Sequence, residues 1–117
     1  MTNPVIYFEI GCKNLEKTSE FYSQLFDWDI KPSGISAPIS TKTKEGIEGH
    51  IASLGHEPHN YSMIYVQVDD IPEYLEKVKK LGGSVMVPET VLPDDGSFAW
   101  VKDIEGTIFG LWKPIKK

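Results

Sequence analysis

The chain has 117 residues, of which 40% are hydrophobic and 25% charged, and its formal net charge at pH 7 is −5. A single globular domain of this size buries enough surface to fold without disulfides or a structural metal. The acidic balance argues against nucleic-acid binding, which needs a basic patch, and no apolar run is long enough for a membrane span. The lone cysteine, Cys12, excludes an internal disulfide and suits a reducing compartment, so we expect a cytoplasmic protein that binds neither nucleic acid nor membrane.

Near the amino terminus, residues 5–10 read VIYFEI and alternate as a β-strand with two different faces does. One face carries Ile6, Phe8 and Ile10 and is suited to a core beneath a helix. The opposite face carries Tyr7 and Glu9. We therefore expect a phenol and a carboxyl group to lie side by side on the face that no helix covers.

The first helix is predicted to follow directly, because Asn14 is a favourable N-cap and apolar residues then recur at helical spacing as far as Phe26. Three weaker strand patterns come next, at WDIKPS (28–33), APISTK (37–42) and GIEGHIASL (46–54). Proline weakens this part of the pattern, because it is confined to strand ends and edges.

Half a chain length later, MIYVQV at 63–68 repeats the pattern of VIYFEI, with Ile64-Tyr65 in the place of Ile6-Tyr7. The repeat puts Ile64, Val66 and Val68 on the covered face and Met63, Tyr65 and Gln67 on the other. Asp70 with Glu73 forms a capping-box pattern for a second helix, which Gly82 and Gly83 end. Three strand patterns complete the chain: SVMVPETV (84–91), SFAWVKD (97–103) and TIFGLWK (107–113).

The element order is thus β-α-β-β-β twice, with one module over about residues 1–58 and another over about residues 59–117 of a single domain. Three stretches, YFEIGCKNLEKTSEFYSQLFDW, MIYVQVDDIPEYLEKVKKLGG and DIEGTIFGLWK, resemble the vicinal oxygen chelate superfamily in their order and spacing. That superfamily includes glyoxalase I, bleomycin-resistance proteins and extradiol dioxygenases. The resemblance implies an α+β fold whose two modules pair into a curled mixed sheet around a cleft, and a homodimer.

Metal-using members of the superfamily hold a divalent ion in this cleft, and the resemblance places their ligand positions on Tyr7, Met63, Gly110 and a residue at or near His50. A neutral phenol, a thioether and a glycine are poor ligands for a hard or borderline divalent ion. We therefore expect no metal and no other cofactor.

Aromatic residues are the main candidates for ligand contact. Gly110, in the middle of a strand, indicates close approach by a ligand or by backbone, and it lies near the two tryptophans of the last hairpin. Each candidate also has a structural explanation. Glu9 could simply be hydrogen-bonded, and the tyrosines could fill the space of the missing metal. Trp112 could pack in the core or in a dimer interface. The candidate ligand-binding residues are Tyr7, Glu9, His50, Met63, Tyr65, Trp100, Gly110 and Trp112.

Three functions are compatible with these residues. The first is a metal-free binding module of the bleomycin-resistance kind, which sequesters or senses a small, flat, partly apolar ligand. The second is a lyase or isomerase related to glyoxalase I, with Glu9 as the catalytic general base and a metal held in an unconventional way by His50. The third is a dimerising interaction module that uses the fold only for association.

Overall fold

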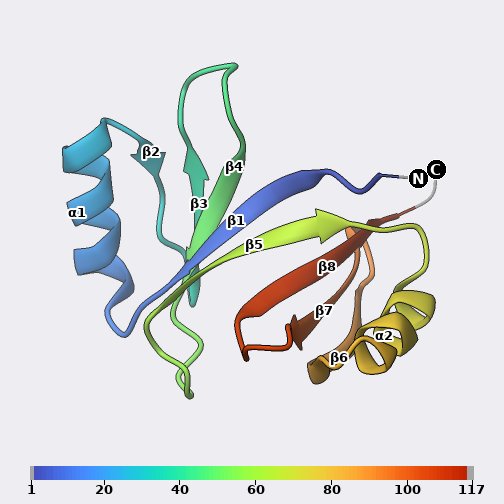
Figure 1. Ribbon diagram of the computed structural model, residues 1–117. Helices are drawn as coiled ribbons and strands as arrows, with labels where there is room; N and C mark the ends of the chain where they lie inside the picture. Colours follow the sequence, from blue (N-terminus) through green and yellow to red (C-terminus); the bar gives the residue numbers. More distant parts are fainter. Residues whose placement is uncertain (1, 116–117) are drawn as a thin grey trace. The chain divides into compact units, whose positions relative to one another are not determined.

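The structure is a computed structural model that describes residues 2–115. Its elements are β1 (Val5–Gly11), α1 (Leu15–Phe26), β2 (Asp29–Ile30), β3 (Ser36–Ser40), β4 (Glu48–Ala52), β5 (Tyr61–Gln67), α2 (Ile71–Lys80), β6 (Ser84–Leu92), β7 (Gly96–Lys102) and β8 (Ile108–Pro114). This order confirms the predicted α+β class with β-α-β-β-β twice (Figure 1). The chain divides into a first unit, residues 7–63, and a second unit, residues 2–6 with 64–115.

In the first unit the strands lie in the order β2-β3-β4-β1, with β1 parallel to β4 and the other neighbours antiparallel. Helix α1 begins where predicted, since the Asn14 side chain accepts a hydrogen bond from the Lys17 amide at 3.0 Å. The helix ends before Asp27, whose φ of 60° lies in the left-handed region. Strand β2 is only two residues long, shorter than predicted, and it ends before Pro32, which cannot donate to a strand ladder.

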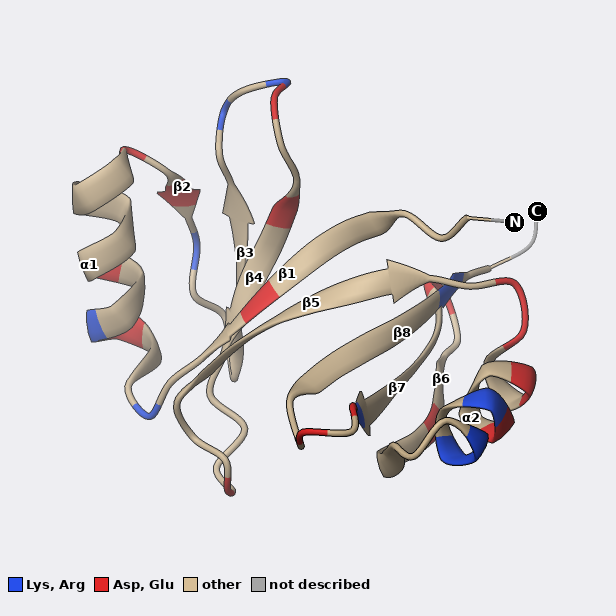
Figure 2. Cartoon of the chain, in the orientation of Figure 1, with Lys and Arg blue, Asp and Glu red and all other residues tan. Residues whose placement is uncertain are grey.

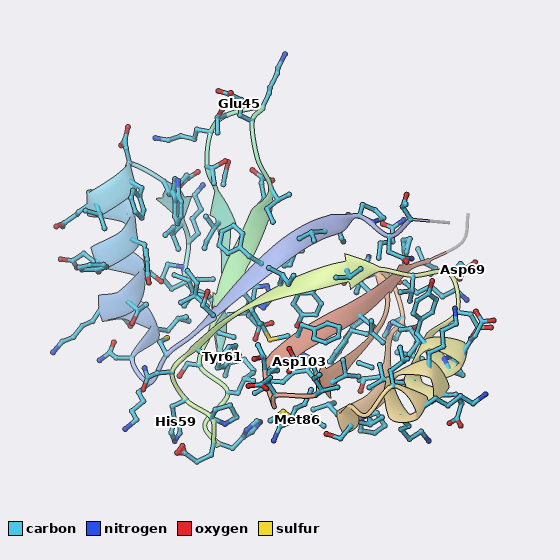
Figure 3. All side chains as sticks on the ribbon, in the orientation of Figure 1. Glu45, His59, Tyr61, Asp69, Met86 and Asp103 are labelled. Atoms are coloured by element: carbon cyan, nitrogen blue, oxygen red, sulfur yellow. The ribbon has the colours of Figure 1, made fainter. Side chains whose placement is uncertain are left out.

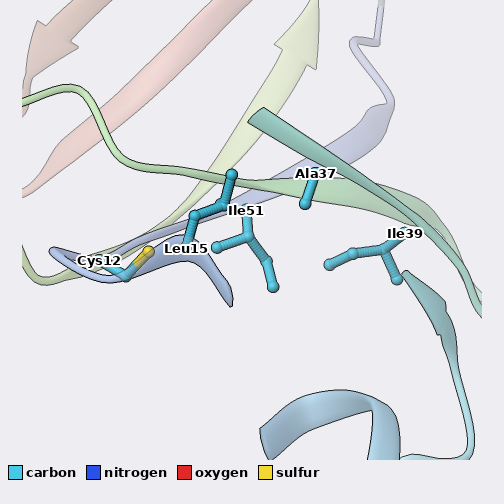
Figure 4. Close-up of a cluster of buried hydrophobic side chains, with 5 residues drawn as sticks. All are labelled: Cys12, Leu15, Ala37, Ile39 and Ile51. Carbon is cyan, nitrogen blue, oxygen red and sulfur yellow. The ribbon is translucent and has the colours of Figure 1, made fainter. Parts of the chain in front are cut away.

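The core of the first unit lies between α1 and its strands. Phe8 and Ile10 pack against this core, which confirms the predicted inner face of β1 for these two residues. Cys12 is a buried free thiol within it. The buried members are Cys12, Leu15, Ala37, Ile39 and Ile51 (Figure 4).

In the second unit the strands lie in the order β5-β8-β7-β6, with β5 parallel to β8 and the other pairs antiparallel. The Asp70 side chain accepts from the Glu73 amide at 3.0 Å, as predicted for the start of α2. Gly82, with φ of 97°, and a 2.8 Å bond from the Gly83 amide to the Val78 carbonyl close the helix. Lysines gather in the last turn of α2, where they complement the helix dipole (Figure 2).

The core of the second unit consists of Val68, Ile71, Ala99, Val101 and Leu111. Val68 occupies the predicted covered position, whereas Ile64 is 43% exposed, so its assignment to the core was wrong. Helix α2 packs on β6, β7 and β8, so strand parity alone does not decide whether a residue of β5 is covered. Neither helix of the described chain is long and apolar enough to span a membrane.

Candidate functional site

A buried carboxyl group is the centre of the polar arrangement in the first unit. Glu9 of β1 is 3% exposed and lies directly opposite His50 of β4 in the strand register. The Nε2 atom of His50 is 3.0 Å from Oε1 of Glu9, and the Tyr61 hydroxyl donates a hydrogen bond to Oε2. Both oxygens of the carboxyl group are therefore engaged by polar partners. We refer to Glu9, His50 and Tyr61 as the Glu9 trio.

Tyr7 extends this arrangement along the same face of β1. Its ring centroid is 5.3 Å from that of His50, with the two planes tilted by 36°. Burial raises the pKa of the Tyr7 phenol above its ordinary value, and the negative charges of Glu9 and Glu48 raise this pKa further. Tyr7 is therefore a neutral hydroxyl near physiological pH, able to donate or to accept a hydrogen bond.

Tyr61 reaches Glu9 because the chain has a glycine beneath its ring. A Cβ atom built on Gly11 would coincide with the Tyr61 ring, so no larger residue at position 11 leaves room for the ring in this place. Tyr61 is not among the residues predicted for the site. A signal existed, because Tyr61 has the same strand parity as Met63 and Tyr65, and Gly11 has the parity of Glu9.

The second unit contains a separate aromatic arrangement. Tyr65 of β5 and Trp100 of β7 both lie opposite Gly110 of β8, one on each side of that strand. The Trp100 Nε1 donates to the Tyr65 hydroxyl at 2.9 Å, and both residues are buried. A Cβ atom on Gly110 would overlap the Tyr65 ring. The missing side chain at position 110 is thus accounted for by the Tyr65 ring.

The predicted site residues fall into these two arrangements, with two exceptions. Tyr7, Glu9 and His50 come together in the first unit, and Tyr65, Trp100 and Gly110 come together in the second. Met63 is 4% exposed and belongs to the first unit. Trp112 is partly buried and lies opposite Phe98 in the β7–β8 ladder. The prediction that all eight residues line one cleft stays a prediction.

The ligand positions implied by the resemblance do not fit a divalent metal. Tyr7 has a raised phenol pKa, which disfavours the phenolate that a metal would need, and the space beside Gly110 is filled by an aromatic ring. Glu9 and His50 offer two suitable donors, but within residues 2–115 no three His, Cys, Asp or Glu side chains form a group that could hold an ion. We therefore derive no chemistry through a metal.

Comparison with known proteins identifies the class. No family model matches the chain. A glyoxylase-like domain-containing protein of Didymella fabae is 30% identical over 107 residues, which cover 84% of each chain. CFP32 of Mycobacterium tuberculosis, a candidate glyoxylase, is 26% identical over 102 residues. That match covers 80% of this chain but 39% of CFP32, so the chain spans about two fifths of the length of this relative.

Solved structures agree on the fold. A member of the glyoxalase/bleomycin resistance protein/dioxygenase superfamily from Vibrio splendidus superposes with a TM-score of 0.66 at 14% identity, over 97% of this chain and all of that chain. A methylmalonyl-CoA epimerase of Streptomyces coelicolor gives 0.67 at 14% identity, over 99% of this chain and all of the other. The chain belongs to the family of glyoxylase-like domain proteins, and it has the fold of the glyoxalase/bleomycin resistance protein/dioxygenase structures.

Proposed function

We propose that the protein binds a small, flat, partly apolar molecule without a metal, and that the face of β1 and β4 with Tyr7, Glu9 and His50 supplies the polar part of the binding site. The observation that carries this proposal is the burial of Glu9 together with its two hydrogen-bonding partners. The rings of Tyr7 and His50, whose centroids are 5.3 Å apart, supply the aromatic part of this site.

Burying a carboxylate costs free energy, and an ion pair in a protein interior is often no more stable than apolar residues of the same volume. The Glu9 trio is therefore better explained by a role in binding a polar group of a ligand than by stability alone. Glu9 holds one ring nitrogen of His50, Nε2, which fixes the orientation of the imidazole and leaves Nδ1 as the atom for meeting a ligand. The neutral Tyr7 hydroxyl offers a second polar contact on the same face.

An acid–base enzyme is the second candidate, and the contact between Glu9 and His50 is the observation that favours it. Carboxylate–imidazole pairs orient histidines that transfer protons. Relatives carry names such as glyoxylase and methylmalonyl-CoA epimerase, which denote lyase and isomerase chemistry. In this candidate Glu9 is the general base. Binding is ranked first because Tyr7, Met63 and Gly110 are poor ligands for the divalent metal that glyoxalase I chemistry uses.

A ligand screen by thermal shift and tryptophan fluorescence tests the proposal. Tyr7→Ala should weaken the binding of the hits about three- to tenfold through the lost aromatic contact alone. Glu105→Gln, at an exposed turn, is the control for charge changes elsewhere. Equal binding to wild type and to Tyr7→Ala would show that the hits bind elsewhere, and the interaction-module hypothesis would then come first.

Glu9→Gln separates binding from catalysis. A binding module should keep most of its affinity, because the amide retains an acceptor for Tyr61. An enzyme that uses Glu9 as general base should bind normally and lose turnover by about a hundredfold or more. Turnover is measured on any hit that wild-type protein converts.

A further inference from the structure

We propose a second ligand site in the first unit, a hollow between α1 and the ends of β1 and β5 that takes a planar aromatic carboxylate. The hollow has a volume of about 420 Å³. Ligand pockets for small molecules typically have volumes of about 300–1,000 Å³. Its wall includes Cys12, Lys17, Phe21, Tyr22, Asn60 and Ser62. Tyr61, labelled in Figure 3 at the beginning of β5, also lines it.

Aromatic side chains of α1 supply the apolar wall. Phe21 is 60% exposed, whereas Leu15 and Ser19 are the residues of α1 that are buried. The Phe21 ring meets the Tyr22 ring edge to face, with centroids 5.2 Å apart. Tyr22 in turn stacks on Trp28 at 6.1 Å with planes only 12° apart. The exposed Phe21 ring is therefore backed by two further rings, which hold it in place for contact with a flat ligand.

The charge of the residues that line the hollow favours an anionic ligand. The chain as a whole carries 17 acidic and 12 basic residues, yet among residues 2–115 Lys17 is the only charged residue that lines the hollow, and no carboxylate does. Within the described part of the chain, Lys17 takes part in none of the ion pairs. The Asn60 amide and the Ser62 hydroxyl add hydrogen-bond donors on the facing side.

These groups together fit a ring bearing a carboxylate. The ring lies against Phe21 and Tyr22, and the carboxylate meets the Lys17 ammonium and the donors at the start of β5. A neutral ring of the same shape keeps the apolar contact and loses the ionic one. The hollow therefore distinguishes the acid from its amide by the contribution of one solvent-exposed ion pair, about two- to fivefold in affinity.

The experiment uses the full chain with 2-naphthoate and 2-naphthamide as probes, and backbone amide NMR as the readout. We expect 2-naphthoate to shift the amides of Cys12, Thr18, Tyr22 and Ser62, and to bind about two- to fivefold more tightly than the amide. Lys17→Gln should abolish that preference. Phe21→Ala should weaken both probes about fivefold or more.

Matched controls come from the same unit. Lys44→Gln removes a lysine outside the hollow, and Leu25→Ala truncates a residue of α1 that is 57% exposed but does not line it. Neither should change binding. Equal affinity for acid and amide would overturn the ligand class, and shifts confined to other residues, or no binding in the millimolar range, would overturn the site. The site of Tyr7, Glu9 and His50 is tested by different variants, so the two proposals succeed or fail separately.

Discussion

The side chains of Trp100 and Tyr65 are hydrogen-bonded to each other across Gly110, which has no side chain. The indole nitrogen of Trp100 donates to the Tyr65 hydroxyl at 2.9 Å, although β8 lies between their strands, and the residue of β8 opposite both is Gly110. The resemblance to metal-using members of the superfamily implies that position 110 corresponds to one of their metal ligands. In this chain the position is a glycine. The Tyr65 ring fills the space that a metal-binding side chain at position 110 would occupy.

Gly110→Ala should destabilise the protein by about 1–3 kcal/mol, because the new methyl group overlaps the Tyr65 ring and forces it away from Trp100. Urea unfolding measures the change. The control is a double-mutant cycle with Tyr65→Ala, since the three nearest atoms to the new methyl all belong to Tyr65. If Gly110→Ala costs as much in the Tyr65→Ala background as in wild type, the ring is not the reason for the glycine.

The helix ends were predictable because they depend on neighbours in sequence. Asn14 bonds to an amide three residues away, as does Asp70, and Gly82 with Gly83 ends α2 through contacts within the same turn. Such interactions are visible as spacings in the sequence. The two-fold repeat of VIYFEI in turn predicted the order of the elements.

The polar site was only partly predictable, because some of its contacts join residues that are far apart in sequence. Glu9 and Tyr7 share a strand, so their common face follows from parity. Tyr61 is 52 residues from Glu9, and its role depends on Gly11 and on where β5 begins. Ile64 was assigned to the core by analogy with Ile6, but Ile64 is 43% exposed, because burial depends on contacts between elements and no local pattern contains that information.

Tyr61→Phe should lower the free energy of unfolding by about 1.5–3 kcal/mol, because the variant removes a hydrogen bond to a buried charged group. Tyr22→Phe is the matched control, a half-buried tyrosine of the same unit for which we expect a change within about 0.5 kcal/mol. Both are compared by urea unfolding at neutral pH. Equal small effects for the two variants would mean that the phenol contributes nothing to holding Glu9.

Protein purified without a histidine tag should contain well under one equivalent of zinc, nickel, iron or manganese. The physical reason is the chemistry of Tyr7, Met63 and Gly110, which offer no carboxylate, imidazole or thiolate at the positions that the resemblance implies. Elemental analysis after dialysis against a weak chelator gives the measurement. Stoichiometric metal retained through that dialysis would contradict the prediction.

We expect a homodimer in solution, the commonest closed oligomer and the usual state in the superfamily that the chain resembles. Within the second unit, β6 pairs with β7 alone, and its last residues Val91 and Leu92 are exposed apolar side chains. Light scattering at micromolar concentration should give about twice the 13.2 kDa of one chain. A mass near 13.2 kDa would count against association.

Stability should fall on the alkaline side as Tyr7 loses its proton. The pKa of Tyr7 is raised above its ordinary value of 10.0, first by burial and then by Glu9 and Glu48, so the folded state holds this proton more tightly than the unfolded chain does. The stabilisation is therefore fully present below pH 10.0 and is lost as the pH rises through the folded-state pKa.

Tyr7→Phe has no phenolic proton at this position, so its free energy of unfolding should decline less than that of wild type above pH 10.0. Glu48→Gln removes one of the two charges and should bring the Tyr7 pKa back toward its ordinary value. Tyrosinate absorbance follows the titration, and urea unfolding at several alkaline pH values follows the stability. Parallel curves for wild type and Tyr7→Phe would contradict a raised pKa at Tyr7, and with it the neutral hydroxyl that the proposed ligand site uses.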